Sequence, residues 1–322
     1  MADEQEAEKT YNSGLEFFKE KKYDQAISAF TKTIALKPTF DKAFYNRALA
    51  FIELNKTQEA LADLDRTISL RDSADYAYVQ RAALEMKTGK SANAEKDINK
   101  ALALNPKNAD AYYQAGVLKM EAANYKEAID FYSKAIANNA DFAFAYNDRG
   151  SAKKMNNDID GSIADYSKAV QLSPNSAFIH NNLGSAYRQK KDYVKAIDEY
   201  NKAVQIKPDY YIAYNNMGQA KLAKNDDLGA YADFTKAISL KNDYAFAYNN
   251  RASACYKLKK YKEAETDCNK AISLNPNYGE AYYNRAVCKE MSLDVKGSCA
   301  DFAKAASLGY QGAKPYTFDC LH

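Results

Sequence analysis

Side chains able to catalyse a reaction or bind a metal ion are few in this chain. It has two histidines, His180 and His322, and five cysteines, all in the last quarter: Cys255, Cys268, Cys288, Cys299 and Cys320. The sequence holds no HExxH zinc motif, no CxxC pair, no GxSxG serine nucleophile and no glycine-rich phosphate loop. We therefore expect a protein that is not an enzyme and that binds no cofactor or metal ion.

Composition and charge narrow the choice of partner. The 322 residues carry 45 Lys and Arg against 42 Asp and Glu, a net charge of +3. Nucleic-acid binding needs a concentrated basic field, so neither DNA nor RNA is an expected partner. No apolar stretch is long enough for a membrane-inserted helix. The start, MADEQEAEKTYN, lacks the apolar core of a secretory signal, so we expect a cytoplasmic protein if Met1 is the native start. An exported or periplasmic protein whose signal has been removed is the alternative.

The feature that organises the chain is a repeat of 34 residues. We number the places of each repeat from 1 to 34. Place 8 is always Gly or Ala, which predicts that two helices approach closely there. Proline ends the second helix at place 32 in five repeats, whereas Asp72, Ala140, Asn242 and Tyr310 at that place predict looser turns. Nine copies follow an acidic extension of residues 1–6 and precede a tail of residues 313–322: 7–40, 41–74, 75–108, 109–142, 143–176, 177–210, 211–244, 245–278 and 279–312.

The residue types that recur at fixed places of the repeat resemble those of one known family. Small residues at places 8, 20 and 27, aromatic residues at places 4 and 24 and proline at place 32 resemble the tetratricopeptide repeat (TPR) family over nearly the whole chain. The resemblance implies an all-α fold, a right-handed superhelical solenoid of antiparallel helix pairs. It also implies that the first helix of each pair lines a concave groove, and that one solenoid replaces the two domains suggested by the length.

Helical periodicity separates a core side of the first helix from a groove side. At about 100° per residue, places 4, 7, 8 and 11 fall together and predict the core, whereas places 2, 5, 6, 9 and 13 predict the groove. In five repeats an Arg at place 7 occurs together with an Asp at place 23. We expect these pairs to be ion pairs that join the two helices of a repeat: Arg47–Asp63, Arg81–Asp97, Arg149–Asp165, Arg251–Asp267 and Arg285–Asp301.

Amide side chains form the most regular row on the groove side. Place 6 is Asn or Gln in eight repeats and Asp148 in the other. An amide both donates and accepts hydrogen bonds, so such a row can bind the backbone of an extended peptide. Asn is also common at this place in the family, which leaves a structural role open. The candidates, one in each of repeats two to nine, are Asn46, Gln80, Gln114, Asp148, Asn182, Asn216, Asn250 and Asn284.

Repeats five to eight add a second amide row and apolar neighbours. Place 5 there is Asn147, Asn181, Asn215 and Asn249, and place 2 is Phe144, Phe178, Ile212 and Phe246. Amides beside apolar pockets suit a peptide with intermittent hydrophobic side chains, so we expect residues 143–252 to bind one. Ordinary packing between repeats is the alternative role for the Phe side chains.

The cysteines and the C-terminus leave two further alternatives open. Cys255 and Cys268, like Cys288 and Cys299, are placed to meet across their own helix hairpin, and such disulfides would indicate an oxidising compartment. Buried free thiols are the alternative, and the odd Cys320 argues against simple pairing. The residues after 312 are too few for a capping helix, so the last repeat could pack against a second copy of the chain. A truncated longer protein is the other explanation.

These observations predict a non-enzymatic scaffold or adaptor that binds an extended peptide segment of a protein partner in its groove. One alternative is a structural assembly subunit that uses its convex surface and its ends. Another is the recognition part of a larger enzyme complex.

Overall fold

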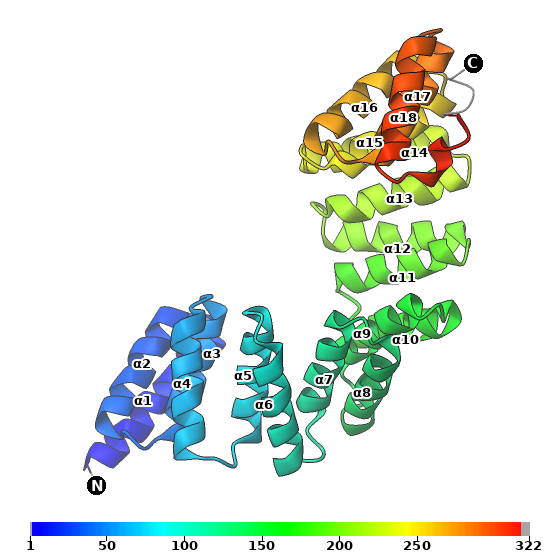
Figure 1. The fold of residues 1–322 in the computed structure, drawn as a ribbon. Helices are drawn as coiled ribbons and strands as arrows, with labels where there is room; N and C mark the ends of the chain where they lie inside the picture. The colour runs from blue at the N-terminus through cyan, green and yellow to red at the C-terminus, as the bar shows by residue number, and fades with distance from the viewer. Residues whose placement is uncertain (1, 317–322) are drawn as a thin grey trace. The chain divides into compact units, whose positions relative to one another are not determined.

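The computed structural model describes residues 2–316, and over that range it consists of eighteen α-helices and one short 3₁₀ helix. The helices pair in sequence order, two to each repeat (Figure 1). The chain divides into two compact units, the N-terminal unit Met1–Asn157 and the C-terminal unit Asp158–His322. The boundary falls inside the fifth repeat, between its two helices, which the uniform repeat of the sequence does not predict.

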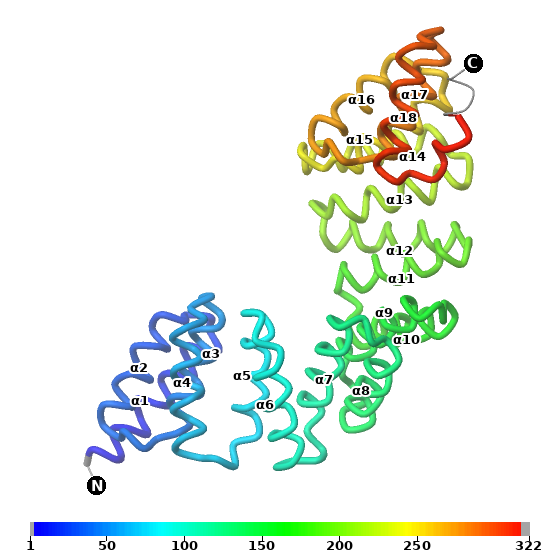
Figure 2. The backbone as a smooth tube through the Cα atoms, in the orientation of Figure 1, coloured from blue at the N-terminus to red at the C-terminus, as the bar shows by residue number. Residues whose placement is uncertain are grey.

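The helices of each unit follow one another along the chain (Figure 2). The N-terminal unit contains α1 (Ala2–Lys19), α2 (Tyr23–Leu36), α3 (Asp41–Glu53), α4 (Thr57–Leu70), α5 (Asp75–Lys87), α6 (Ser91–Leu104), α7 (Ala109–Glu121), α8 (Tyr125–Asn138) and α9 (Ala143–Met155). The C-terminal unit contains α10 (Ile159–Leu172), α11 (Ala177–Gln189), α12 (Tyr193–Ile206), α13 (Tyr211–Ala223), α14 (Asp227–Leu240), α15 (Ala245–Lys257), α16 (Tyr261–Leu274), α17 (Gly279–Met291), α18 (Val295–Ser307) and the 3₁₀ helix η1 (Gln311–Ala313).

The turn between the two helices of a repeat has a constant backbone geometry. Place 15 is left-handed in all nine repeats, with φ between 57° and 75°. Only Gly89 is a glycine among these residues, so packing of the helix pair imposes this conformation on ordinary side chains. The turn between repeats is equally constant. Helices before Asp72, Ala140 and Asn242 end at place 30, and the next N–H donates to the place 27 carbonyl at 2.9 Å, as it does before proline. The prediction of looser turns is therefore wrong at these three positions.

Small residues at place 8 admit large side chains at place 24. A Cβ built on Gly14, Gly116, Gly184 or Gly218 would lie 2.5–2.8 Å from the aromatic ring at place 24 of the same repeat. Three repeats with Ala at place 8 carry the smaller Leu64, Ile98 or Cys268 at place 24, and only Ala286 faces an aromatic ring, that of Phe302. Within one repeat, a smaller residue at place 8 of the first helix thus makes room for a larger one at place 24 of the second helix, and the interior stays filled.

The predicted ion pairs hold the helix pairs together. Four of them lie within one unit, and all four are bidentate, with N–O distances of 2.5–2.8 Å. Each Arg also donates to the place 25 side chain of the preceding repeat; Arg251, for example, lies 3.2 Å from Thr235 Oγ1. The Arg therefore joins two helices of its own repeat and one of its neighbour, which confirms the packing role for these four pairs.

Both ends of the described chain differ from the expectation. Residues 2–6 are part of α1. Glu4 forms an ion pair with Lys37, directly after α2, at 2.6 Å, and Glu6 forms one with Lys32 of α2 at 2.8 Å. At the other end, Ala313 is buried and the Tyr316 ring stacks on Phe302 with centroids 4.5 Å apart. These tail residues pack on the last helix pair, whereas Leu293 and Val295 beside the start of α18 are exposed. Self-association through this end stays a prediction.

Candidate functional site

The first helices of successive repeats form one face of the C-terminal unit. Helices α11, α13, α15 and α17 contact one another in that order. We call the surface formed by places 2, 5, 6 and 9 of these four helices the inner face. In α11, α13 and α15 none of the twelve side chains at these places is ionisable. The inner face is therefore polar but nearly uncharged.

Amide side chains of the inner face bond one another across repeats. Asn216 Nδ2 donates to Asn181 Oδ1 at 2.9 Å, and Asn250 Nδ2 donates to Asn215 Oδ1 at the same distance. Asn284 repeats the contact with Asn249 at 2.8 Å. In each case place 6 of one repeat donates to place 5 of the repeat before it. The two amide rows predicted from the sequence are thus one row of bonds between repeats.

Burial gives the two amides of each bond different roles. Asn181, Asn215 and Asn249 are 6%, 3% and 0% exposed, whereas Asn182, Asn216, Asn250 and Asn284 are half-buried. Asn249 also donates to the hydroxyl of Tyr278 at 3.1 Å. The place 5 amides consequently take part in the packing between repeats, and their contact with a peptide stays a prediction. The place 6 amides remain at the surface.

The N-terminal unit carries the remaining predicted amides in less uniform surroundings. Asn46 Nδ2 donates to the Tyr11 hydroxyl at 2.8 Å, and Gln80 and Gln114 are half-buried on α5 and α7. Asn147 is buried and donates to Asp148 Oδ1, whose second oxygen accepts from the Tyr113 hydroxyl at 2.6 Å. Burial raises the pKa of Asp148, and burial together with this carboxylate raises the pKa of Tyr113. Tyrosine thus replaces place 5 Asn as the partner of place 6 in this unit.

The aromatic side chains at place 2 reach the surface. Phe144, Phe178 and Phe246 are 54%, 38% and 49% exposed, and Ile212 is half-buried. Phe246 also packs between Tyr244 and Tyr278, with ring centroids at 5.6 and 5.1 Å. Phe246 therefore packs between repeats and also presents an exposed apolar surface.

A cavity of about 450 Å³ opens on the inner face between α15 and α17. Ser253, Tyr283 and Asn284 line it from the inner face, and Asn284 Nδ2 lies 3.3 Å from Ser253 Oγ. Tyr316 of the tail closes one side. Sequence analysis missed this cavity because its wall includes a tail residue that no repeat pattern can place. The further lining residues are Ala252, Tyr256, Lys257, Val287, Cys288 and Glu290.

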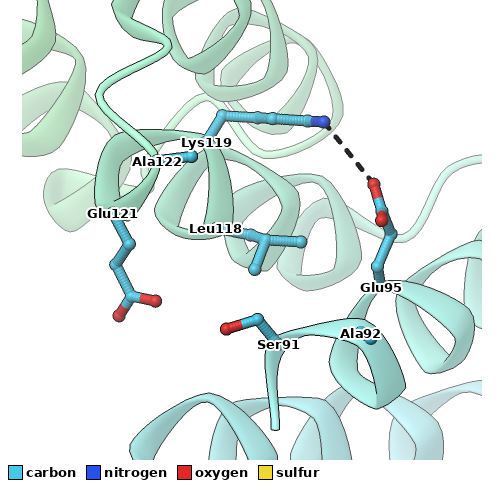
Figure 3. Close-up of a pocket in the computed structure, with 7 residues that line it drawn as sticks. All are labelled: Ser91, Ala92, Glu95, Leu118, Lys119, Glu121 and Ala122. Atoms are coloured by element: carbon cyan, nitrogen blue, oxygen red, sulfur yellow. Dashed lines mark hydrogen bonds and ion pairs between the residues drawn. The ribbon is translucent and has the colours of Figure 1, made fainter. Parts of the chain in front are cut away.

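A second cavity, of about 420 Å³, lies in the N-terminal unit between the start of α6 and the end of α7 (Figure 3). Lys119 Nζ lies 3.5 Å from Glu95 and 3.3 Å from Glu127, so the cation already bridges two repeats. Its lining residues come from the start of α6 and the end of α7 and lie outside places 2, 5, 6 and 9. We interpret this hollow as a structural seam with no ligand of its own.

One histidine is buried with both ring nitrogens bonded. His180 Nδ1 lies 2.6 Å from Glu199 Oε2, and Nε2 lies 3.0 Å from the carbonyl oxygen of Pro174. A carboxylate and a carbonyl only accept hydrogen bonds, so the protonated ring, which has a donor at each nitrogen, satisfies both contacts. The bond to Glu199 and the Pro174 carbonyl raise the pKa of His180 against the effect of burial. This pair holds α11 to α12 and to the turn after α10.

Three of the cysteines follow the alternative interpretation, whereas Cys299 belongs to a disulfide. Cys255, Cys268 and Cys288 are buried free thiols, so neither Cys255–Cys268 nor Cys288–Cys299 is bonded in the structure. Cys320 lies outside the described residues. Within residues 2–316, no three His, Cys, Asp or Glu side chains are grouped so that they could hold a metal ion. In the same part of the chain, no helix is long and apolar enough to span a membrane.

Comparison with protein families assigns the repeats. One family model described as "Tetratricopeptide repeat" matches residues 245–278, another with that description matches 11–77 and 79–141, and one described as "TPR repeat" matches 154–190 and 184–225. The chain belongs to the tetratricopeptide repeat family. Repeats of this family generally form protein-interaction scaffolds. No curated protein matches the sequence significantly.

Solved structures share the fold at low sequence identity. A chain in the crystal structure of the APC/C hetero-tetramer Cut9-Hcn1 is 14% identical over 98% of this chain and 76% of its own, with a TM-score of 0.64. The pilF protein of Pseudomonas aeruginosa is 20% identical over 66% of this chain and 96% of its own, with a TM-score of 0.58. A tetratricopeptide repeat protein from Parabacteroides merdae is 20% identical over 78% and 99%, with a TM-score of 0.57. At these identities the likeness establishes the fold alone.

Proposed function

We propose that this protein is a non-enzymatic scaffold that binds an extended segment of a partner protein along the inner face of its C-terminal unit. The observation that carries the proposal is the state of the place 6 amides. Among residues 2–316, Asn216 and Asn250 make one side-chain hydrogen bond each, through one N–H. The second N–H and the carbonyl oxygen of both amides remain for a ligand.

The chemistry of the face favours the peptide backbone as the ligand. A backbone presents alternating donors and acceptors, which the place 6 amides can match without reading side chains. Places 2, 5, 6 and 9 of α11, α13 and α15 offer no partner to a charged side chain, and an unpaired charge there would lose its hydration. Charged groups come close only at the cavity, where Lys257 and Glu290 belong to the lining. We therefore expect a segment that is poor in charged residues.

The cavity between α15 and α17 supplies an anchor point for such a segment. Its volume of about 450 Å³ falls within the usual range of ligand pockets. Tyr256, Tyr283 and Val287 offer apolar walls, and Ser253 and Asn284 offer polar groups at its edge. One apolar side chain of the bound segment would fill it.

The experiment is an array of immobilised short peptides of random sequence, probed with the full chain. We expect the wild type to select uncharged segments with an apolar anchor. The double variant N216A/N250A should bind them at least tenfold more weakly, because it loses two backbone contacts worth about 1 kcal/mol each. The matched control N175A/N242A removes two exposed amides from turns of the same unit and should bind like the wild type.

A second variant separates lost contacts from lost folding. Ser253→Phe fills the cavity and leaves the Asn–Asn bonds between repeats in place, although it removes the 3.3 Å contact of Ser253 with Asn284. It should abolish selection of the apolar anchor. Thermal unfolding of each variant shows whether the unit still folds. Peptide binding that is equal in the wild type, N216A/N250A and Ser253→Phe would move the function to the outer surfaces or the ends, as the assembly-subunit alternative predicts.

A further inference from the structure

Three buried thiols gather at the junction of the last two repeats. Cys255 on α15, Cys268 on α16 and Cys288 on α17 belong to one cluster with Ala252 and Ala264. Each thiol is at most 2% exposed. Small apolar side chains of any kind would fill this space, so packing alone does not require cysteine at three of its positions.

Two of the three thiols contact each other across the repeat boundary. The interaction between these two sulfur groups raises the pKa of Cys268 and lowers the pKa of Cys288. Burial raises the pKa of Cys255 to about 12. Cys288 is therefore the most easily ionised thiol of the cluster, and the thiolate is the form that reacts with oxidants. Its contact is with Cys268, rather than with the hairpin partner expected from the sequence.

Cys288 also has a route to solvent. It lines the cavity of about 450 Å³ on the inner face, together with Ser253, Tyr283 and Asn284. A small neutral oxidant fits such a space, whereas Cys268 lies behind Cys288 and is absent from the lining. The geometry thus separates an attacking thiol from a resolving thiol.

We propose that Cys288 is an oxidation site for hydroperoxides and that Cys268 resolves the product to a disulfide joining α16 to α17. The Cys288 thiolate attacks the outer peroxide oxygen, the O–O bond breaks, and the alkoxide or hydroxide leaves with a proton taken from water. The Cys268 sulfur then attacks the resulting sulfenic acid and displaces water. In total, two thiols and one hydroperoxide give one disulfide, one alcohol or water, and one further water.

Peptide mapping of the reduced full chain after treatment with hydrogen peroxide tests the proposal. Trypsin separates the thiols into different peptides: Cys255 in ASACYK, Cys268 in EAETDCNK, Cys288 in AVCK and Cys299 in GSCADFAK. We expect the linked pair EAETDCNK–AVCK, formed equally well in the matched control Cys255→Ser. Cys299 already belongs to a disulfide, so a link of GSCADFAK to a peptide outside the cluster is expected whatever the cluster does. A dominant link of AVCK or EAETDCNK to ASACYK or GSCADFAK, or no link to AVCK, would overturn the assignment.

The order of the two steps has its own test. In Cys268→Ser the resolving thiol is absent, so Cys288 should accumulate as a sulfenic acid that dimedone traps on AVCK. In Cys288→Ser, dimedone should label no peptide of the cluster, since the attacking thiol is gone. Labelling of Cys268 in Cys288→Ser at the wild-type rate of disulfide formation would contradict the proposed order. Both readouts are independent of peptide binding, so they stand whether or not the proposed function holds.

Discussion

The side-chain amide of Asn284 donates a hydrogen bond to the side-chain oxygen Oδ1 of Asn249 at 2.8 Å, and Asn249 is completely buried. The same contact joins Asn250 to Asn215 and Asn216 to Asn181. A buried amide with several satisfied bonds fixes the register between neighbouring repeats, because a shifted helix would leave it unpaired. The C-terminal unit therefore uses its amide row first to align its repeats.

Removing Asn249 tests this role. Asn249→Ala leaves the Tyr278 hydroxyl and an Asn284 N–H without their partners and creates a small void, so we expect the free energy of unfolding to fall by about 2 kcal/mol. Urea denaturation measures the change. The exposed Asn277→Ala serves as the control and should shift stability by no more than about 0.5 kcal/mol. A loss as small for Asn249 as for Asn277 would show that the bonds between repeats contribute little.

The sequence predicts most of the fold because the same information occurs nine times. A helix boundary, a small place 8 or an Arg–Asp pair recurs at a fixed place, so chance matches are filtered out. The side toward which a place 5 amide points is harder to predict. Place 5 lies at the margin between the groove side and the contact with the next repeat. The direction in which its amide points depends on the place 6 donor of that next repeat. Tyr316 and the cavity it closes occur once, so no repeat pattern indicates them.

We expect the Arg251–Asp267 ion pair to contribute more to the stability of the fold than an ion pair at the surface does. Asp267 accepts two bonds, at 2.7 and 2.8 Å, and its side chain is almost buried. Asp267→Ala leaves a mostly buried guanidinium without its carboxylate, at an expected cost of about 3 kcal/mol. The exposed pair Lys190–Asp160 provides the control, and Asp160→Ala should cost less than about 1 kcal/mol. Chemical denaturation compares the two variants, and similar losses would refute the packing role.

Because the side chains at places 8 and 24 share space, a second substitution at place 24 should restore part of the stability lost by a substitution at place 8. A Cβ on residue 218 would lie 2.6 Å from the Phe234 ring, so Gly218→Ala should lower the free energy of unfolding by about 1–3 kcal/mol. The double variant G218A/F234L reproduces the Ala48–Leu64 combination of the second repeat and should recover part of that loss. Thermal denaturation of the two single variants and the double variant measures the coupling. Additive losses would mean that the two places do not share space.

The His180–Glu199 contact makes the stability of the C-terminal unit depend on pH. Because its pKa is raised in the folded state, His180 stabilises the fold fully below its ordinary pKa of about 6.5, and the contribution disappears as pH rises through the folded value. Glu199 and Lys202 face it from α12, with Lys202 Nζ at 2.9 Å from Glu199, and the lowered pKa of Glu199 keeps that carboxylate ionised. We expect the urea midpoint to fall as the pH rises above about 6.5. His180→Phe replaces the histidine by the residue type of Phe44 at the same place. Its midpoint should stay level over this range, and a decline parallel to that of the wild type would assign the pH dependence to other groups.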